Sequence, residues 1–418
     1  MSYRKLKLVL FALLYWLGNA VTRADDLSTA LELPDAQRLA LTQQPLLEAQ
    51  AQAVTAAREN AIAATQLPDP KLTVGLADWP IEGAERYSLR RDDFTMVTAG
   101  VTQDFPHAEK RRLRGARGEH EAELAEQVLT ANRLMVARDA GLAWLNAWKP
   151  ERYLELLRAS EREAELQVQA TEIAYTAGRA TQAEVLAARV SLELLRDETA
   201  DAEQQAQDAR GALSRWIGNN EAQRPLSASL PSWAPPAPLE DALAKLRAHP
   251  HLNAETKRVA IAEDDVALAK QAYKPDWGIE LGYGHRPDFA DFVSVNVTVD
   301  LPVFTGDRQD RNLGAKLAEQ EQAEESREDM FRQEEAELRR HWESWQRLQD
   351  RVTRFDSIIL PQSEQRTAAA LATWQAGQGT LAAVLDARRM ALDNRMKRLN
   401  LVTDAARRRV HLLYFAGE

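Results

Sequence analysis

The stretch "IAYTAGRATQAEVLAARVSL", which begins at Ile173, nearly recurs as "ALATWQAGQGTLAAVLDARRMAL" from Ala370. Aligning the two copies pairs the following positions: Tyr175 with Trp374, Gly178 with Gly377, Thr181 with Thr380, and Val185 with Val384. Both copies interrupt long, charge-rich sequence of helical character. A phrase that returns after roughly 200 residues indicates an internal duplication, and the rest of the chain can be searched for it.

Three further landmarks recur in the same order. The sequences around Pro45, Pro68 and Pro106 match those around Pro250, Pro275 and Pro302. We therefore expect a first repeat over 25–223 and a second over 239–418, joined by the proline-rich linker "RPLSASLPSWAPPAP" at 224–238. Each repeat reads as a helix, two short strands and a long helical hairpin that turns at the repeated phrase.

The strands are expected at about 71–79 and 94–104 in the first repeat, and at about 276–284 and 291–301 in the second. In "FVSVNVTVDL" the odd positions from Val293 to Leu301 are apolar and the even positions are polar. This period of two is typical of strands with one apolar and one polar face. The segments are about as long as strands that cross a bilayer. A soluble sheet on a core is the alternative, but the remaining sequence offers little to cover four apolar faces.

Four strands per chain favour an oligomer. An open sheet in lipid leaves backbone groups unpaired, so a barrel has to close between chains. Two chains give an eight-stranded barrel filled by side chains, and three give twelve strands with space inside. The polar inner face favours three. The predicted fold is mainly α with a small transmembrane β part, in which three chains complete a 12-stranded β-barrel.

Composition excludes several functions. The net charge of −10 argues against nucleic acid as a partner, and the absence of cysteine removes disulfides, thiol catalysis and a lipid-modified N-terminal cysteine. No phosphate-binding loop, dinucleotide fingerprint, nucleophile elbow or metal-ligand spacing occurs. We expect no enzyme activity, no cofactor and no metal site. Residues 1–24 read as a cleavable signal peptide: basic residues, an apolar run, and small residues before Asp25.

The duplicated plan, "LPDPKL" and "QDFP" beside the strands, and the turns "YTAGRATQAEVL" and "WQAGQGTLAAVL" resemble the TolC-type outer-membrane efflux proteins. The resemblance implies a homotrimer in the outer membrane of a Gram-negative bacterium, whose β-barrel is continued by an α-helical barrel that extends into the periplasm. It also implies a periplasmic adaptor and an inner-membrane pump of the RND type as partners. "LPDPKLTVGLADWP" is most similar to the heavy-metal branch, which serves copper/silver or cobalt/zinc/cadmium pumps. Drug-efflux and protein-secretion ducts share the architecture, and a periplasmic scaffold without a pore is a more remote alternative.

The resemblance places the repeated phrase at the periplasmic tips, where the adaptor docks. The tip residues would be Tyr175, Gly178, Thr181, Val185, Trp374, Gly377, Thr380 and Val384. Glu184 and Asp386 follow the tip glycines and are candidates for a pore gate, since carboxylates around a narrow pore select for cations. Solvation of the helix surface is the alternative. "EKRRLRGAR" at Glu109–Arg117 either lies at the membrane interface beside anionic groups of outer-membrane lipid or solvates a helix start.

Overall fold

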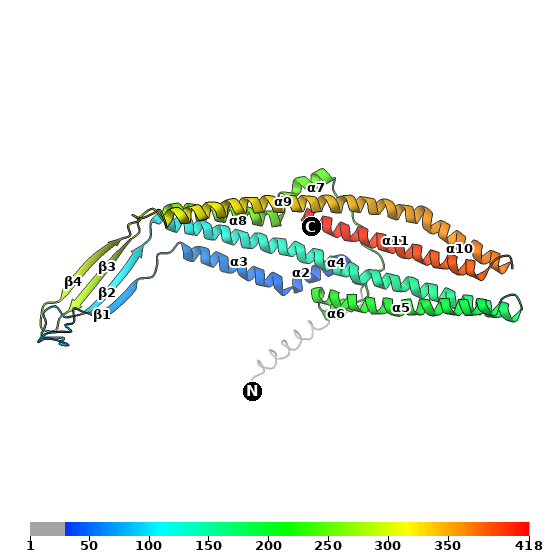
Figure 1. Cartoon of the computed structure of the whole chain (residues 1–418), viewed down its shortest axis with the longest axis horizontal. Helices are drawn as coiled ribbons and strands as arrows, with labels where there is room; N and C mark the ends of the chain where they lie inside the picture. The colour runs from blue at the N-terminus through cyan, green and yellow to red at the C-terminus, as the bar shows by residue number, and fades with distance from the viewer. Residues whose placement is uncertain (1–29, 418) are drawn as a thin grey trace, which may run out of the picture. The chain divides into compact units, whose positions relative to one another are not determined.

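The computed structural model describes residues 30–417, so the predicted signal peptide at 1–24 lies outside the described residues. The fold class is confirmed: the chain is mainly helical, with one four-stranded antiparallel sheet (Figure 1). The first half contains α2 (Leu33–Gln43), α3 (Pro45–Ala64), β1 (Lys71–Ala77), β2 (Met96–Phe105), α4 (Ala108–Thr176), α5 (Gln182–Ile217) and α6 (Asn219–Ala222). The second contains α7 (Leu239–Leu246), α8 (Pro250–Gln271), β3 (Trp277–His285), β4 (Phe292–Val299), α9 (Gln309–Arg354), the π-helix η1 (Phe355–Ile359), α10 (Leu360–Gln375) and α11 (Leu381–Ala416).

The element order repeats: a helix, two strands and a long helical hairpin occur twice. Two compact units are built from these elements, and each takes segments from both halves of the chain. The described part of unit 1 comprises residues 30–47, 132–246 and 334–417, and unit 2 comprises Glu48–Ala131 and Arg247–Gln333.

The sheet belongs to unit 2 and has the order β1-β2-β3-β4, with every neighbouring pair antiparallel. Its register aligns side chains of one kind across the strands. Val101 of β2 lies opposite Leu72 of β1 and Leu281 of β3, and Leu281 in turn lies opposite Val295 of β4. One face is therefore apolar over all four strands, as the alternation predicted.

The apolar face is exposed. Val74, Leu281 and Val295 keep 68%, 56% and 64% of their surface accessible, and every residue of β4 is exposed. The opposite face is polar or glycine: Thr102 of β2, Glu280 of β3 and Asn296 of β4 lie in register. Within residues 30–417, β1 and β4 each pair with only one strand, so the sheet has two free edges.

Unit 1 is built on helix packing around two tryptophans of α4. Trp144 and Trp148 stack with ring centroids 6.2 Å apart. The Trp144 indole donates to the carbonyl of Leu31 at 3.1 Å, and the Trp148 indole donates to Ser227 at 2.9 Å. Each indole N–H thus finds an acceptor outside α4. The proline-rich segment 224–238 is therefore partly fixed against this helix by Ser227, rather than acting only as a spacer.

The two helical prolines behave differently. Helix α4 continues through Pro150 without a break. Pro361 lies in the first turn of α10, directly after the π-helix η1. The residues before Pro361 keep helical angles, so its missing N–H interrupts a continuous helical run, and the π-turn just before it accommodates this interruption.

A second core cluster in unit 1 joins α4, α5 and α11 through Leu157, Ala202 and Leu392. The predicted alanine-rich seam of α5 is buried at Val185, Ala188, Leu192, Thr199, Ala202, Ala206 and Leu213. Small residues on such a seam allow helices to approach closely.

Among the described helices, none combines the length and the apolar character that a bilayer-spanning helix requires.

Candidate functional site

The repeated phrase forms two tight turns between helices of unit 1, here called the tip turns. The first is residues 176–182 between α4 and α5, and the second is residues 375–381 between α10 and α11. Gly178 and Gly377 adopt positive φ angles of 72° and 74°. Only glycine enters this region without steric cost, so both glycines end their helices and reverse the chain.

Equivalent backbone hydrogen bonds close the tip turns. Gly178 N–H donates to Tyr175 O and Gly377 N–H to Trp374 O, both at 2.9 Å. Thr181 and Thr380 then take extended backbone angles and cap the returning helices. Their hydroxyls accept from the N–H groups of Glu184 and Ala383, each at 3.3 Å. The duplication therefore preserves a helix stop, a reversal and a helix start.

Glu184 lies in the first turn of α5 and completes a capping box. Its carboxylate accepts the backbone N–H of Thr181 at 2.8 Å and the Thr181 hydroxyl at 3.0 Å. The Thr181 N–H is the main reason that the pKa of Glu184 lies below its usual range, and the N–H of Leu381 at the start of α11 adds to it. The second tip turn has Ala383 at the matching position and no such box. The predicted gate carboxylate is thus engaged in capping within its own chain.

Asp386, the second gate candidate, lies on α11 and is 61% exposed. Its carboxylate forms an ion pair of 2.6 Å with Arg366 of α10. The structure therefore does not join Glu184 and Asp386 in one cluster; each has its own partner.

The other predicted tip residues divide into exposed and buried groups. Tyr175 is 48% exposed, whereas Val185 and Val384 are 8% and 0% exposed. The valines begin the packed seams of α5 and α11, and the aromatic side chain of Tyr175 remains available to a partner.

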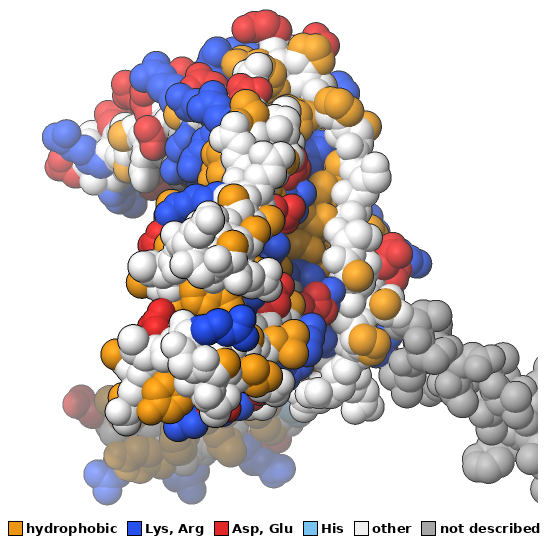
Figure 2. Space-filling view, turned by 90° about the vertical axis from the view of Figure 1, so that its right-hand side faces the viewer, with side chains coloured by type: hydrophobic (Ala, Val, Ile, Leu, Met, Phe, Trp, Pro, Cys, Tyr) orange, Lys and Arg blue, Asp and Glu red, His pale blue; other side chains and the backbone are white. Residues whose placement is uncertain are grey.

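A groove of about 1160 Å³ lies beside the tip turns, between the α4–α5 and α10–α11 hairpins. On α5 it exposes an apolar stripe of Leu186, Val190 and Leu194, which are 52%, 59% and 59% accessible. The sequence interpretation missed this stripe, although its spacing of four residues places it on one helix face. Figure 2 views this side of the molecule and shows hydrophobic side chains between charged ones.

Arginines connect the hairpins along the groove. Arg388 of α11 donates to the Glu163 carbonyl of α4 at 2.7 Å, and Arg389 of α11 pairs with Glu198 of α5 at 2.6 Å. Burial lowers the pKa of Arg388, while the hydrogen bond that Arg389 donates to the Glu198 carboxylate raises the pKa of Arg389. The groove thus has an apolar wall from α5 and ionic links that hold α11 against the first hairpin.

Two histidines form a separate titratable pair in unit 1. The rings of His341 (α9) and His411 (α11) stack with centroids 4.1 Å apart. Burial is the main reason that the pKa of His341 falls to about 3 and that of His411 to about 4, and Arg408 adds to both shifts. Both rings are neutral near pH 7.

Among residues 30–417, no three histidine, aspartate or glutamate side chains gather in a way that would hold a metal ion. What the site offers is an exposed aromatic, a partly apolar groove and carboxylates at helix starts, which suits protein docking.

Comparisons with known proteins identify a family model and solved structures that are similar to this chain. The family model described as outer membrane efflux protein matches residues 36–219. That family consists of channels, not enzymes. The search of curated proteins finds no match.

Solved structures share the fold over almost the whole chain. The outer membrane protein VceC from Vibrio cholerae is 21% identical, with a TM-score of 0.77 over 92% of this chain and 96% of that chain. The CmeC outer membrane channel of Campylobacter jejuni is 14% identical, with a TM-score of 0.78 over 92% of this chain and 85% of the other. CusC, whose structures concern folding and transmembrane channel formation, is 15% identical, with a TM-score of 0.74 over 93% and 92%.

Proposed function

We propose that this chain, which matches the outer membrane efflux protein family and has the fold of outer-membrane channels, is one protomer of an export duct in a Gram-negative outer membrane. The observation that carries the proposal is the sheet. Its apolar face is exposed, its other face is polar, and both of its edges are free. In water such a sheet would be poorly covered and would invite association.

In a bilayer each of these three features, the apolar face, the polar face and the free edges, finds a partner. Lipid covers the apolar face, the polar face borders water, and β1 of one protomer pairs with β4 of the next. Three copies give twelve strands and an interior wide enough for water. A homotrimer is the assembly that we propose, with the long helices continuing the duct into the periplasm.

We assign the tip turns to docking of a periplasmic adaptor that connects the duct to an inner-membrane RND pump. The exposed Tyr175 and the stripe of Leu186, Val190 and Leu194 offer apolar contacts of the kind that an amphipathic helix fills. Trp374 lies at the end of α10, just before the second tip turn, as Tyr175 lies at the end of α4 before the first. The glycines and threonines of both turns hold the geometry, and Val185 and Val384 anchor them to the core.

The gate assignment of Glu184 and Asp386 is kept as a proposal with distinct roles. Asp386 is exposed, and its partner Arg366 lies on the neighbouring helix, so a partner protein can exchange this ion pair. The Glu184 carboxylate accepts the Thr181 N–H of the capping box, so the position of its charge beside the pore depends on the first tip turn staying folded. Planar-bilayer conductance of Asp386→Asn should show reduced cation selectivity, with Asp393→Asn on the same helix as the control. Equal selectivity in both variants would remove Asp386 from the gate.

For the cargo we propose heavy-metal cations, on the resemblance of "LPDPKLTVGLADWP" to the heavy-metal branch. A strain that lacks the chain should become sensitive to copper, silver, cobalt, zinc or cadmium salts. Sensitivity to lipophilic drugs alone would assign the duct to drug efflux.

The duct itself is tested by detergent extraction and native mass determination. A membrane-derived trimer is expected, because both sheet edges need partners. A monomer recovered in the soluble periplasmic fraction would refute the proposal.

A further inference from the structure

A second cavity lies in unit 2, where the strands meet the helices. This junction pocket has a volume of about 660 Å³ and is lined by Lys110, Arg114, Leu268, Ala272, Lys274, Asp276, Asp300, Leu301, Pro302, Arg308 and Gln309. Its walls come from the start of α4, the end of α8, the segments flanking β3 and β4, and the start of α9. From its charge and its apolar border, we infer that the junction pocket binds the phosphate headgroup of an anionic phospholipid.

The pocket has more positive charge than its own acids use. Lys110 is occupied, since its ammonium pairs with Asp276 at 2.8 Å and donates to the Lys274 carbonyl at 3.0 Å. The side chains of Arg114, Lys274 and Arg308 make no hydrogen bond or ion pair with any residue of 30–417. Lys110, Arg114, Lys274 and Arg308 stand against the two acids Asp276 and Asp300 in the lining, so a net positive charge of two remains for an anion from outside the chain.

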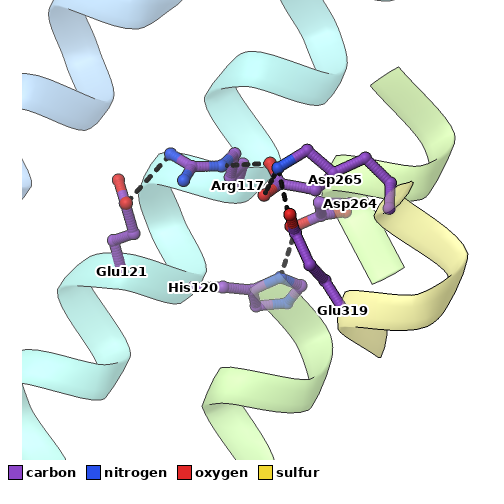
Figure 3. A network of polar contacts seen from close by, with 7 residues as sticks. Arg117, His120, Glu121, Asp264, Asp265 and Glu319 are labelled. Carbon is purple, nitrogen blue, oxygen red and sulfur yellow. Dashed lines mark hydrogen bonds and ion pairs between the residues drawn. The ribbon is translucent and has the colours of Figure 1, made fainter. Parts of the chain in front are cut away.

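The surrounding helices show that pairing is otherwise the rule. One turn further along α4, Arg117 pairs with Asp265 at 2.6 Å and with Glu121 at 2.9 Å (Figure 3). In the same network His120 contacts Asp264 at 2.7 Å. Arg117 thus has two carboxylate partners in Figure 3, whereas Arg114, Lys274 and Arg308 of the junction pocket form no ion pair among residues 30–417. The surplus is confined to the strand–helix junction.

The N-terminal ends of two helices strengthen the attraction of the junction pocket for an anion. Helices α4 and α9 begin at Ala108 and Gln309, beside the pocket, and helix N-termini carry partial positive charge. Asp276 already accepts the His107 N–H at 2.8 Å, next to the start of α4. The Asp276 carboxylate shows that an oxyanion binds beside this helix start, and a phosphate accepts hydrogen bonds in the same way.

Apolar side chains border the pocket on the strand side. Leu301 lines it and is 68% exposed, and the following Val303 and Phe304 are 67% and 80% exposed. Trp277, the first residue of β3, stacks on Phe105, the last residue of β2, with ring centroids 4.4 Å apart. A basic pocket beside exposed apolar and aromatic residues fits a lipid, whose headgroup and acyl chains lie in this order, better than it fits a free anion.

This inference rests on the proposed placement of the strands in a bilayer. The test incorporates the full-length chain into nanodiscs of phosphatidylcholine that contain a minor fraction of phosphatidylglycerol, and native mass spectrometry counts the lipids retained. The probe variant is Arg114→Gln/Arg308→Gln. The matched control, Arg332→Gln/Arg347→Gln, removes the same charge from exposed arginines that pair with Glu328 and Glu343.

The wild type and the control should retain phosphatidylglycerol over phosphatidylcholine. The probe variant should lose roughly 30-fold in that preference, from the usual contribution of two basic residues near an anionic surface. Equal retention of both lipids by the wild type, or equal preference in probe and control, would overturn the pocket assignment. So would displacement of the lipid by millimolar inorganic phosphate, which would indicate a simple anion site.

The nanodisc experiment distinguishes failure of the proposed function from failure of the pocket assignment. A chain that does not enter neutral phosphatidylcholine nanodiscs at all would overturn the membrane placement, and the pocket proposal with it. A chain that enters them without a lipid preference would overturn the pocket proposal alone.

Discussion

Replacing Val295 by arginine distinguishes a bilayer from water on the apolar face of the sheet. Val295 lies on β4 opposite Leu281 and is 64% exposed in the chain. If lipid covers this face, Val295→Arg places a charge in hydrocarbon, which costs about 2–4 kcal/mol near the bilayer midplane. That free energy corresponds to a roughly 30- to 900-fold shift in the folding equilibrium. If water covers it, an exposed substitution changes stability by only about 0.5 kcal/mol in either direction.

The neighbouring Asn296 provides the control, because it points to the polar face and lies opposite Glu280. Asn296→Arg should be neutral or slightly stabilising, since opposite charges across an antiparallel pair contribute about 0.2–1 kcal/mol. Urea unfolding of the protein refolded into phosphatidylcholine vesicles measures both variants against the wild type. A Val295→Arg midpoint equal to that of Asn296→Arg would refute the membrane assignment of this face.

Three further outcomes are expected in unit 1. Gly178→Ala should destabilise the chain by about 1 kcal/mol, because the φ angle of Gly178 is 72°. Gly211→Ala, at an open helical position, should stabilise the chain by about 0.5–1 kcal/mol, and thermal unfolding compares the two variants. Ala383→Glu should supply the capping box that the second tip turn lacks, and so slow amide hydrogen exchange at the start of α11. Ala382→Glu is the control, and equal exchange rates in both variants would contradict the capping argument. The lowered pKa values of His341 and His411 favour their neutral forms in the folded state, so their contribution is complete above the unfolded pKa near 6.5 and is lost as pH falls toward about 4 and 3. The double His→Gln variant should flatten the decline in melting temperature across this interval, and an unchanged slope would show that other groups titrate there.

The features that the sequence predicts best are those carried by short-range pattern. The alternation around Val295 reflects the pleat of the strand itself, and Gly178 and Gly377 mark reversals that few other residues allow. The strands observed lie within a few residues of the expected spans. Such features need no knowledge of which distant segments touch.

The roles of individual side chains were harder to predict because they depend on partners. Glu184 stands three residues after Thr181, which is a capping-box spacing, yet the sequence interpretation assigned it to a gate. Asp386 pairs with Arg366 across a hairpin, and nothing in the local sequence selects that arginine among the others nearby. The stripe from Leu186 to Leu194 has the same periodicity as the buried seam of α5. Only packing separates the two sets.

The free edges of the sheet have a consequence for assembly. Pairing of β4 from one copy with β1 of the next is heterologous, because the two contacting surfaces differ. Such contacts close into a ring only when the twist contributed by each copy adds up to a full turn, and otherwise they propagate as an open polymer. The number of protomers is therefore determined by strand tilt and stagger, not by the hydrogen bonds that join them. Insertion of one residue that forms a bulge in β1 or β4 would alter the size of the ring while leaving each protomer folded.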